Sequence, residues 1–89
     1  MDSKEIKTLI PSWINSQVET LRKQFDPEIE KEEFETLTKN PKNWKRIIKQ
    51  KDGENILRVF DCKPFDDQLR LYVLLDSSGK IISFEFQTE

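Results

Sequence analysis

Residues 69–86, LRLYVLLDSSGKIISFEF, decide the fold of this chain. Large apolar side chains occupy every second position of the first half, which is typical of a half-buried strand. These positions are Leu69, Leu71, Val73 and Leu75. Segment 76–79 contains turn residues, and the alternation then resumes with Ile82, Phe84 and Phe86 expected to face inward. The stretch therefore predicts an antiparallel hairpin of strands 68–76 and 80–87.

A second hairpin is predicted before the first. Segment 51–54 reads KDGE, and its Asp-Gly pair fits a tight two-residue turn between strands 44–50 and 55–62. The pairs expected across this turn are Ile48 with Leu57 and Arg46 with Val59. The alternative for residues 41–51 is a helix, because Trp44, Ile47 and Ile48 also have helical spacing. The link 63–67 contains Pro64 and is predicted to be a turn or bulge outside the ladder.

Two helices are predicted before the strands. Residues 2–25 carry apolar side chains at steps of three and four, which is the period of an amphipathic helix. Asp2 and Glu5 have the spacing of a capping box, and Pro11 is expected to kink the helix. Asp26-Pro27 then predicts the start of a short acidic helix over 27–38.

These elements predict one α+β domain over residues 1–89, with a helical part at about 2–38 and a sheet part at about 44–88. The expected architecture is a long amphipathic helix and a short acidic helix packed on a four-stranded antiparallel meander. One face of that sheet is apolar enough to take the long helix across it.

The order of elements resembles a known group of small domains. A long N-terminal helix followed by a curled antiparallel meander is similar to the cystatin-like and nuclear-transport-factor-like folds. Residues 75–86, LDSSGKIISFEF, look like the last hairpin of small members of that group. The resemblance implies the fold, and it carries no functional motif over to this sequence.

Composition excludes several kinds of chemistry. The 89 residues include no histidine and a single cysteine, Cys62. A Ser-His-Asp or Cys-His catalytic arrangement and a histidine-ligated zinc site are therefore excluded. Asp66-Asp67 and Asp76 lack the spacing of a calcium loop. We expect no enzymatic activity, no cofactor and no metal, and we expect Cys62, at a strand end, to be a buried thiol.

Location is predicted from the same composition. The first residues, MDSKE, lack the basic and apolar regions of a signal peptide. The longest apolar run, Tyr72–Leu75, is far shorter than the ~20 residues of a membrane-spanning helix. A single thiol fits a reducing compartment. These features predict a soluble cytoplasmic protein with no membrane partner.

The formal net charge of −2 conceals two opposed blocks. Segment 26–35 is acidic and segment 39–51 is basic. The acids are Asp26, Glu28, Glu30, Glu32, Glu33 and Glu35, and the bases are Lys39, Lys42, Lys45, Arg46, Lys49 and Lys51. Such blocks can bind a protein of opposite charge, or they can be ordinary solvated faces, with lysines that protect an edge strand from aggregation.

A non-enzymatic adaptor or regulatory protein that binds an unidentified protein is therefore the favoured functional hypothesis. The candidate contact residues are Trp44, Lys45, Arg46 and Lys49 in the basic block, and Glu28, Glu32 and Glu35 in the acidic block. One alternative is single-stranded nucleic-acid binding through 39–51, where Trp44 would stack on a base. Another is a small-ligand carrier with a pocket between helix and sheet.

Overall fold

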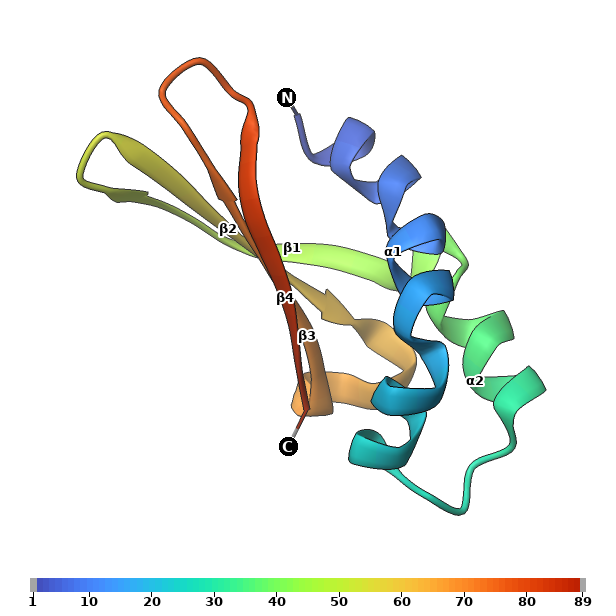
Figure 1. Ribbon diagram of the computed structural model, residues 1–89. Coiled ribbons are helices and arrows are strands. Elements are labelled where there is room, and N and C mark those ends of the chain that lie inside the picture. The colour runs from blue at the N-terminus through green and yellow to red at the C-terminus, as the bar shows by residue number, and fades with distance from the viewer. Residues whose placement is uncertain (1, 89) are drawn as a thin grey trace.

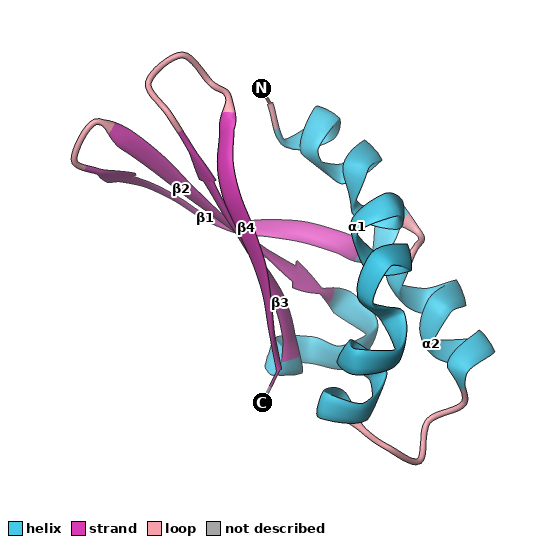
Figure 2. Cartoon of the chain, in the orientation of Figure 1, coloured by secondary structure: helices cyan, strands magenta, loops and turns pink. Residues whose placement is uncertain are grey.

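The computed structural model describes residues 2–88 and has the predicted α+β architecture. Helices α1 (Ser3–Phe25) and α2 (Lys31–Thr38) lie on one side of a four-stranded antiparallel sheet (Figure 1). The strands are β1 (Trp44–Asp52), β2 (Asn55–Cys62), β3 (Leu69–Leu75) and β4 (Ile81–Thr88). Their spatial order is β1-β2-β3-β4. Figure 2 shows that the turns of both hairpins extend beyond the part of the sheet that the helices cover.

Helix α1 begins where the sequence predicts, but its irregularity lies elsewhere. The Asp2 carboxylate accepts a hydrogen bond from the Glu5 N–H at 2.8 Å, which confirms Asp2 as the N-cap. Pro11 stays within helical backbone, whereas Gln17 departs from it at φ −144° and ψ 24°. The Ser16 hydroxyl donates to the Trp13 carbonyl, the acceptor that the Gln17 N–H would use in a regular helix. The kink predicted at Pro11 is therefore found at Gln17.

The connection between the helices corrects the predicted start of the second one. Asp26 ends α1, since its N–H donates to the Arg22 carbonyl, and its carboxylate accepts from the Glu28 N–H. The Arg22 guanidinium holds the carbonyls of Pro27 and Ile29 at 3.2 and 2.9 Å. These bonds fold residues 26–29 into a turn, so α2 begins at Lys31 and not at residue 27. The predicted end at residue 38 is confirmed.

The first hairpin is predicted correctly in its strands but not in its register. Residues 44–52 form a strand, so the helical alternative for this segment is wrong. Gly53 has φ +65° and Glu54 has no positive φ, which places the turn at Gly53-Glu54. A glycine with positive φ at the first turn position is typical of a type II′ turn.

The predicted pairs of this hairpin shift accordingly. Ile48 lies opposite Val59, and Arg46 lies opposite Phe60 across a bulge that contains Ile47. The turn lies one residue later than predicted, which moves the partner of Ile48 from Leu57 to Val59 and would put Arg46 opposite Asp61. The bulge then brings Arg46 opposite Phe60.

The second hairpin follows the prediction except at Ile82. The four inward positions of β3 are all buried, as expected. In β4 the ladder pairs Leu74 with Ser83 but Leu75 with Ile81, so Ile82 is an extra residue in a bulge. Ile82 is 52% exposed, whereas Ile81 packs against the core with Phe84. The inward orientation predicted for Ile82 is therefore wrong, and so is the outward orientation that the same alternation predicts for Ile81, because the bulge changes the alternation.

The core joins both helices to one face of the sheet. Buried side chains of α1 and α2 meet those of all four strands, and they include Ile6, Ile10, Ile14, Phe34, Trp44, Phe60, Leu71 and Phe86. Trp13 stacks on Phe84 with ring centroids 4.2 Å apart. The link after β2 is a 3₁₀ helix, Lys63–Gln68, in place of the simple turn or bulge predicted at 63–67. Its Phe65 lies 4.5 Å from Phe25 between ring centroids.

The turn of the second hairpin depends on one carboxylate. Asp76 accepts hydrogen bonds from the Ser78 N–H, the Ser78 hydroxyl and the Lys80 N–H at 2.9, 2.7 and 2.9 Å. The hydroxyl bond and the two backbone bonds hold the pKa of this carboxyl below its ordinary value of 3.8. A group with a lowered folded pKa stabilises the fold above its unfolded pKa, and this contribution is lost as the pH falls through the folded value.

We therefore expect Asp76→Ala to lower the urea midpoint at neutral pH. The difference from the parent chain should shrink as the pH falls below 3.8 and through the lowered pKa of the folded chain, because the parent carboxyl then gains a proton and loses its charge-assisted hydrogen bonds. Asp76→Asn is the control, since its amide oxygen still accepts hydrogen bonds but does not titrate. A difference between Asp76→Ala and the parent that stays constant from pH 7 to pH 2 would contradict this explanation.

Candidate functional site

Strand β1 forms an exposed edge of the sheet. Trp44 at its start is buried, but every residue from Lys45 to Asp52 is exposed. The exposed residues include two large apolar side chains, Ile47 at 40% and Ile48 at 39%. One side of β1 pairs with β2, and the other side has no neighbouring strand. This stretch therefore offers backbone groups, cations and apolar side chains to solvent.

The cations of β1 lie on both faces of the sheet. Arg46 is opposite Phe60, whose side chain is in the core, so Arg46 lies on the helix-covered face. Lys49 and Lys51 share that face despite their odd spacing from Arg46, because the bulge shifts the alternation and pairs them with Arg58 and Ile56, which alternate with Phe60. Lys45 lies on the opposite face with Ile48. The candidate residues Lys45, Arg46 and Lys49 thus belong to one exposed strand but not to one face.

Trp44 is not part of this surface. It has no exposed area, and its indole N–H donates to the Thr38 carbonyl at 2.7 Å. Its ring lies 5.9 Å from that of Phe86 between centroids. In this conformation it can neither stack on a base nor contact a partner, so its predicted role as a contact residue is corrected to a core role.

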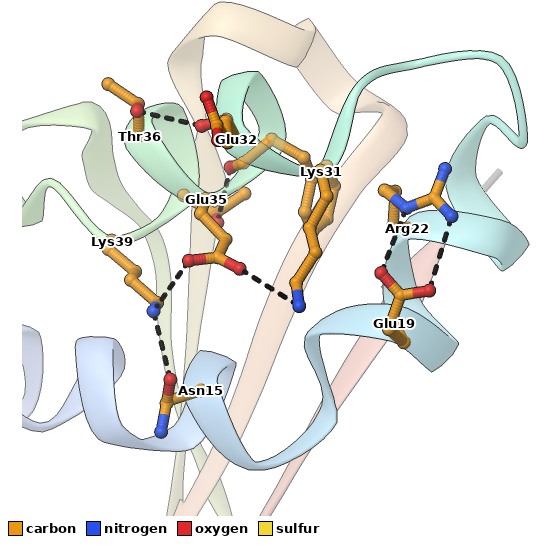
Figure 3. Close-up of polar contacts among 10 residues, drawn as sticks. Asn15, Glu19, Arg22, Lys31, Glu32, Glu35, Thr36 and Lys39 are labelled. Carbon is orange, nitrogen blue, oxygen red and sulfur yellow. Dashed lines mark hydrogen bonds and ion pairs between the residues drawn. The ribbon is translucent and has the colours of Figure 1, made fainter.

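The beginning of the basic block is tied to the helices. Lys39 is half-buried, and its ammonium donates to Asn15 at 3.0 Å and to Glu35 at 3.1 Å (Figure 3). The segment 39–51 is therefore not a continuous basic strip. Its free cations are concentrated on β1.

The acidic candidates are partly neutralised within the chain. Glu35 lies between two ammonium groups, with Lys39 at 3.1 Å and Lys31 at 3.9 Å (Figure 3). Glu28 and Glu32 are exposed. Figure 1 shows α2 and the β1–β2 turn at opposite ends of the molecule, whose longest extent is 41 Å. The structure therefore does not bring the acidic and basic candidates together.

Cys62 is confirmed as a buried thiol. Burial, followed by the nearby charge of Asp61, raises its pKa to about 12. At neutral pH this thiol is protonated, and a protonated thiol is a poor nucleophile.

Two hollows of the described surface lie outside the space between helices and sheet. One, of about 540 Å³, is lined by residues of the two hairpin ends, including Lys51, Ile56 and Ser77. The other, of about 220 Å³, is lined by Tyr72, Leu74 and Glu85 among others. The space under α1 is filled by core side chains. This geometry does not support the small-ligand carrier, which needs a pocket there.

Residues 2–88 hold neither a metal-binding cluster nor a membrane-spanning helix. No three His, Cys, Asp or Glu side chains of this part of the chain form a group that could hold a metal ion. Neither described helix is long and apolar enough to cross a membrane.

Sequence reasoning missed the exposed isoleucines of β1. The signal was present, because two adjacent isoleucines, Ile47-Ile48, break the alternation of a strand. Ile81-Ile82 is the second such doublet, and it also coincides with a bulge. No protein-family model, curated protein or solved structure matches this chain, so its resemblance to cystatin-like folds stays a prediction.

Proposed function

We propose that this chain is a non-enzymatic adaptor domain that binds an acidic, extended segment of a partner protein along β1. The observation that carries the proposal is the exposed run from Lys45 to Asp52 on a free sheet edge. We further propose that it acts in the cytoplasm, where a free thiol such as Cys62 stays reduced.

Strand addition explains why these residue types occur together. An extended peptide that pairs with an edge strand gains main-chain hydrogen bonds and places its side chains alternately on the two faces. Cations on both faces of β1 would then meet carboxylates on both faces of the peptide. Ile47 and Ile48 would supply apolar contact between these charges.

The same lysines protect the edge from unsuitable strands. Lysine on a free edge discourages pairing with neutral or basic strands. An acidic strand is the exception, because its charge compensates that of β1. The protective role and the binding role of Lys45, Lys49 and Lys51 are therefore compatible, and together they make the edge selective.

The first experiment uses as its probe a blocked peptide as long as β1 that repeats Glu-Glu-Val-Val, so that carboxylates lie on both faces of the extended peptide. We expect it to bind the labelled chain in a fluorescence anisotropy titration, with an affinity that falls as salt is added. The double variant Lys49→Glu/Lys51→Glu should weaken binding about tenfold, since two attractive contacts become repulsive. Backbone amide shifts in NMR spectra should be confined to β1 and the adjacent residues of β2.

The matched control is Lys4→Glu/Lys23→Glu, which changes net charge equally on exposed positions of α1. It should leave affinity nearly unchanged. Equal losses in both double variants would show that only net charge attracts the peptide, and the proposal would be wrong. Tighter binding of an oligothymidylate than of the peptide, at the same salt concentration, would favour nucleic acid and contradict it as well.

A further inference from the structure

The other edge of the sheet, β4, lacks the lysines that protect β1 from pairing with unsuitable strands. Its sequence, IISFEFQT, holds one ionisable side chain, Glu85, and neither proline nor lysine. Its only irregularity is the bulge at Ile82, near its first residue. Natural edge strands usually carry charges, prolines or bulges along their length, because an unprotected edge pairs with another strand.

No strand in the described part of the chain pairs with the outer side of β4. Figure 1 shows β4 in front of the other strands, with both helices to one side of the sheet. Helix α1 contacts β4 through Trp13, whose ring stacks on that of Phe84. This contact lies above the face of the sheet and not beside the backbone of β4. The most exposed large apolar residue, Ile82, also belongs to β4.

We propose that β4 pairs antiparallel with β4 of a second copy of this chain, around a two-fold axis, to form a continuous eight-stranded sheet. A two-fold pair is closed, so each copy uses its β4 edge once. The charges favour this pairing over one through β1, because β1 would place several lysines beside those of its copy. This dimer rests on β4 alone and is independent of the peptide proposed for β1.

The charge of Glu85 excludes one register of this pair. Centring the pair on Glu85 would place two carboxylates directly opposite each other, which is destabilising. Centring it on Phe84 places each Glu85 opposite Ser83 of the second copy. It also brings the two Trp13–Phe84 stacks side by side on the helix-covered face, and aromatic cross-strand pairs are favourable. We therefore infer the register centred on Phe84.

The test changes Ser83 in two directions. Ser83 is exposed, on the face opposite the helices, so both variants should fold. Sedimentation equilibrium of the full chain should show a dimer that dissociates on dilution. In Ser83→Lys the new ammonium group would lie opposite Glu85 of the second copy, and the two-fold axis makes two such contacts. This variant should tighten the dimer about tenfold. Ser83→Glu would face Glu85 with like charge and should weaken the dimer by a similar factor.

Two controls make the result specific. Ser77→Lys and Ser77→Glu introduce the same charges at an exposed position of the same hairpin, outside the strand, and should change the dissociation constant little. Lys49→Glu/Lys51→Glu should leave the dimer intact, which separates this inference from the function proposed for β1. A chain that stays monomeric at all concentrations would overturn the inference. So would Ser83 variants that shift in the same direction, or Ser77 variants that shift equally.

Discussion

Trp44→Ala is expected to lower the free energy of unfolding by about 3–5 kcal/mol, which is the usual cost of removing a large buried aromatic side chain. A chain of this length has a total stability of roughly 4–13 kcal/mol, so the variant should lose a large share of it and should unfold at room temperature if the parent lies at the lower end of this range. The cause is the complete burial of the indole, which packs against Phe86 of β4. Urea denaturation followed by far-UV circular dichroism measures the change.

Two controls separate volume from hydrogen bonding at this position. Trp44→Phe keeps most of the ring but leaves the Thr38 carbonyl without its indole donor; we expect a loss of about 1–3 kcal/mol. Trp13→Ala removes the same residue type from a half-buried stack on Phe84. If Trp44→Ala cost no more than Trp13→Ala, the core role assigned to Trp44 would be wrong.

Phe34→Ala should have the second largest effect, with a loss of about 3–5 kcal/mol. Phe34 is fully buried on α2, and its ring lies 6.0 Å from that of Phe25 and 5.9 Å from that of Phe65, between centroids. It therefore joins the short helix to the end of α1 and to the link after β2. Thr38 is the other buried residue of α2, so the helix has little else to hold it in place.

The variant Phe34→Leu keeps an apolar side chain of smaller volume and should cost much less than alanine does. NMR spectra provide a second measurement, because loss of the ring should broaden amide signals of α2 before those of β2 and β3. A Phe34→Ala chain with parent-like stability would show that the aromatic group does not anchor α2.

Much of the fold could be predicted because its signals are local and repeated. The alternation in β3 and the stepwise apolar stripe of α1 each extend over several residues, and each is confirmed. The start of α2 could not be predicted, because it depends on Arg22, which binds carbonyls five and seven residues further along the chain. The site of the kink could not be predicted either, because Thr8 and Ser12 make the same hydroxyl bond to the carbonyl three residues back as Ser16 does, and the helix stays regular there.

The candidate site could be predicted only in part. Charge identified Lys45, Arg46 and Lys49, and the structure places all three on the exposed edge. Trp44 has the same sequence context, but its burial depends on contacts with Thr38 and Phe86 that sequence spacing does not show. The Ile47-Ile48 doublet did carry a readable signal, because a strand cannot bury two adjacent side chains on one face without a bulge.

Because Cys62 is buried, the rate at which its thiol reacts reports on transient opening of the sheet. The thiol is inaccessible, and its pKa of about 12 keeps it protonated in the closed state, so a thiol reagent reacts with it only in molecules whose sheet has opened. Cys62 is paired with Trp44 across β1 and β2. The rate of thiol modification therefore follows transient opening at the base of the first hairpin.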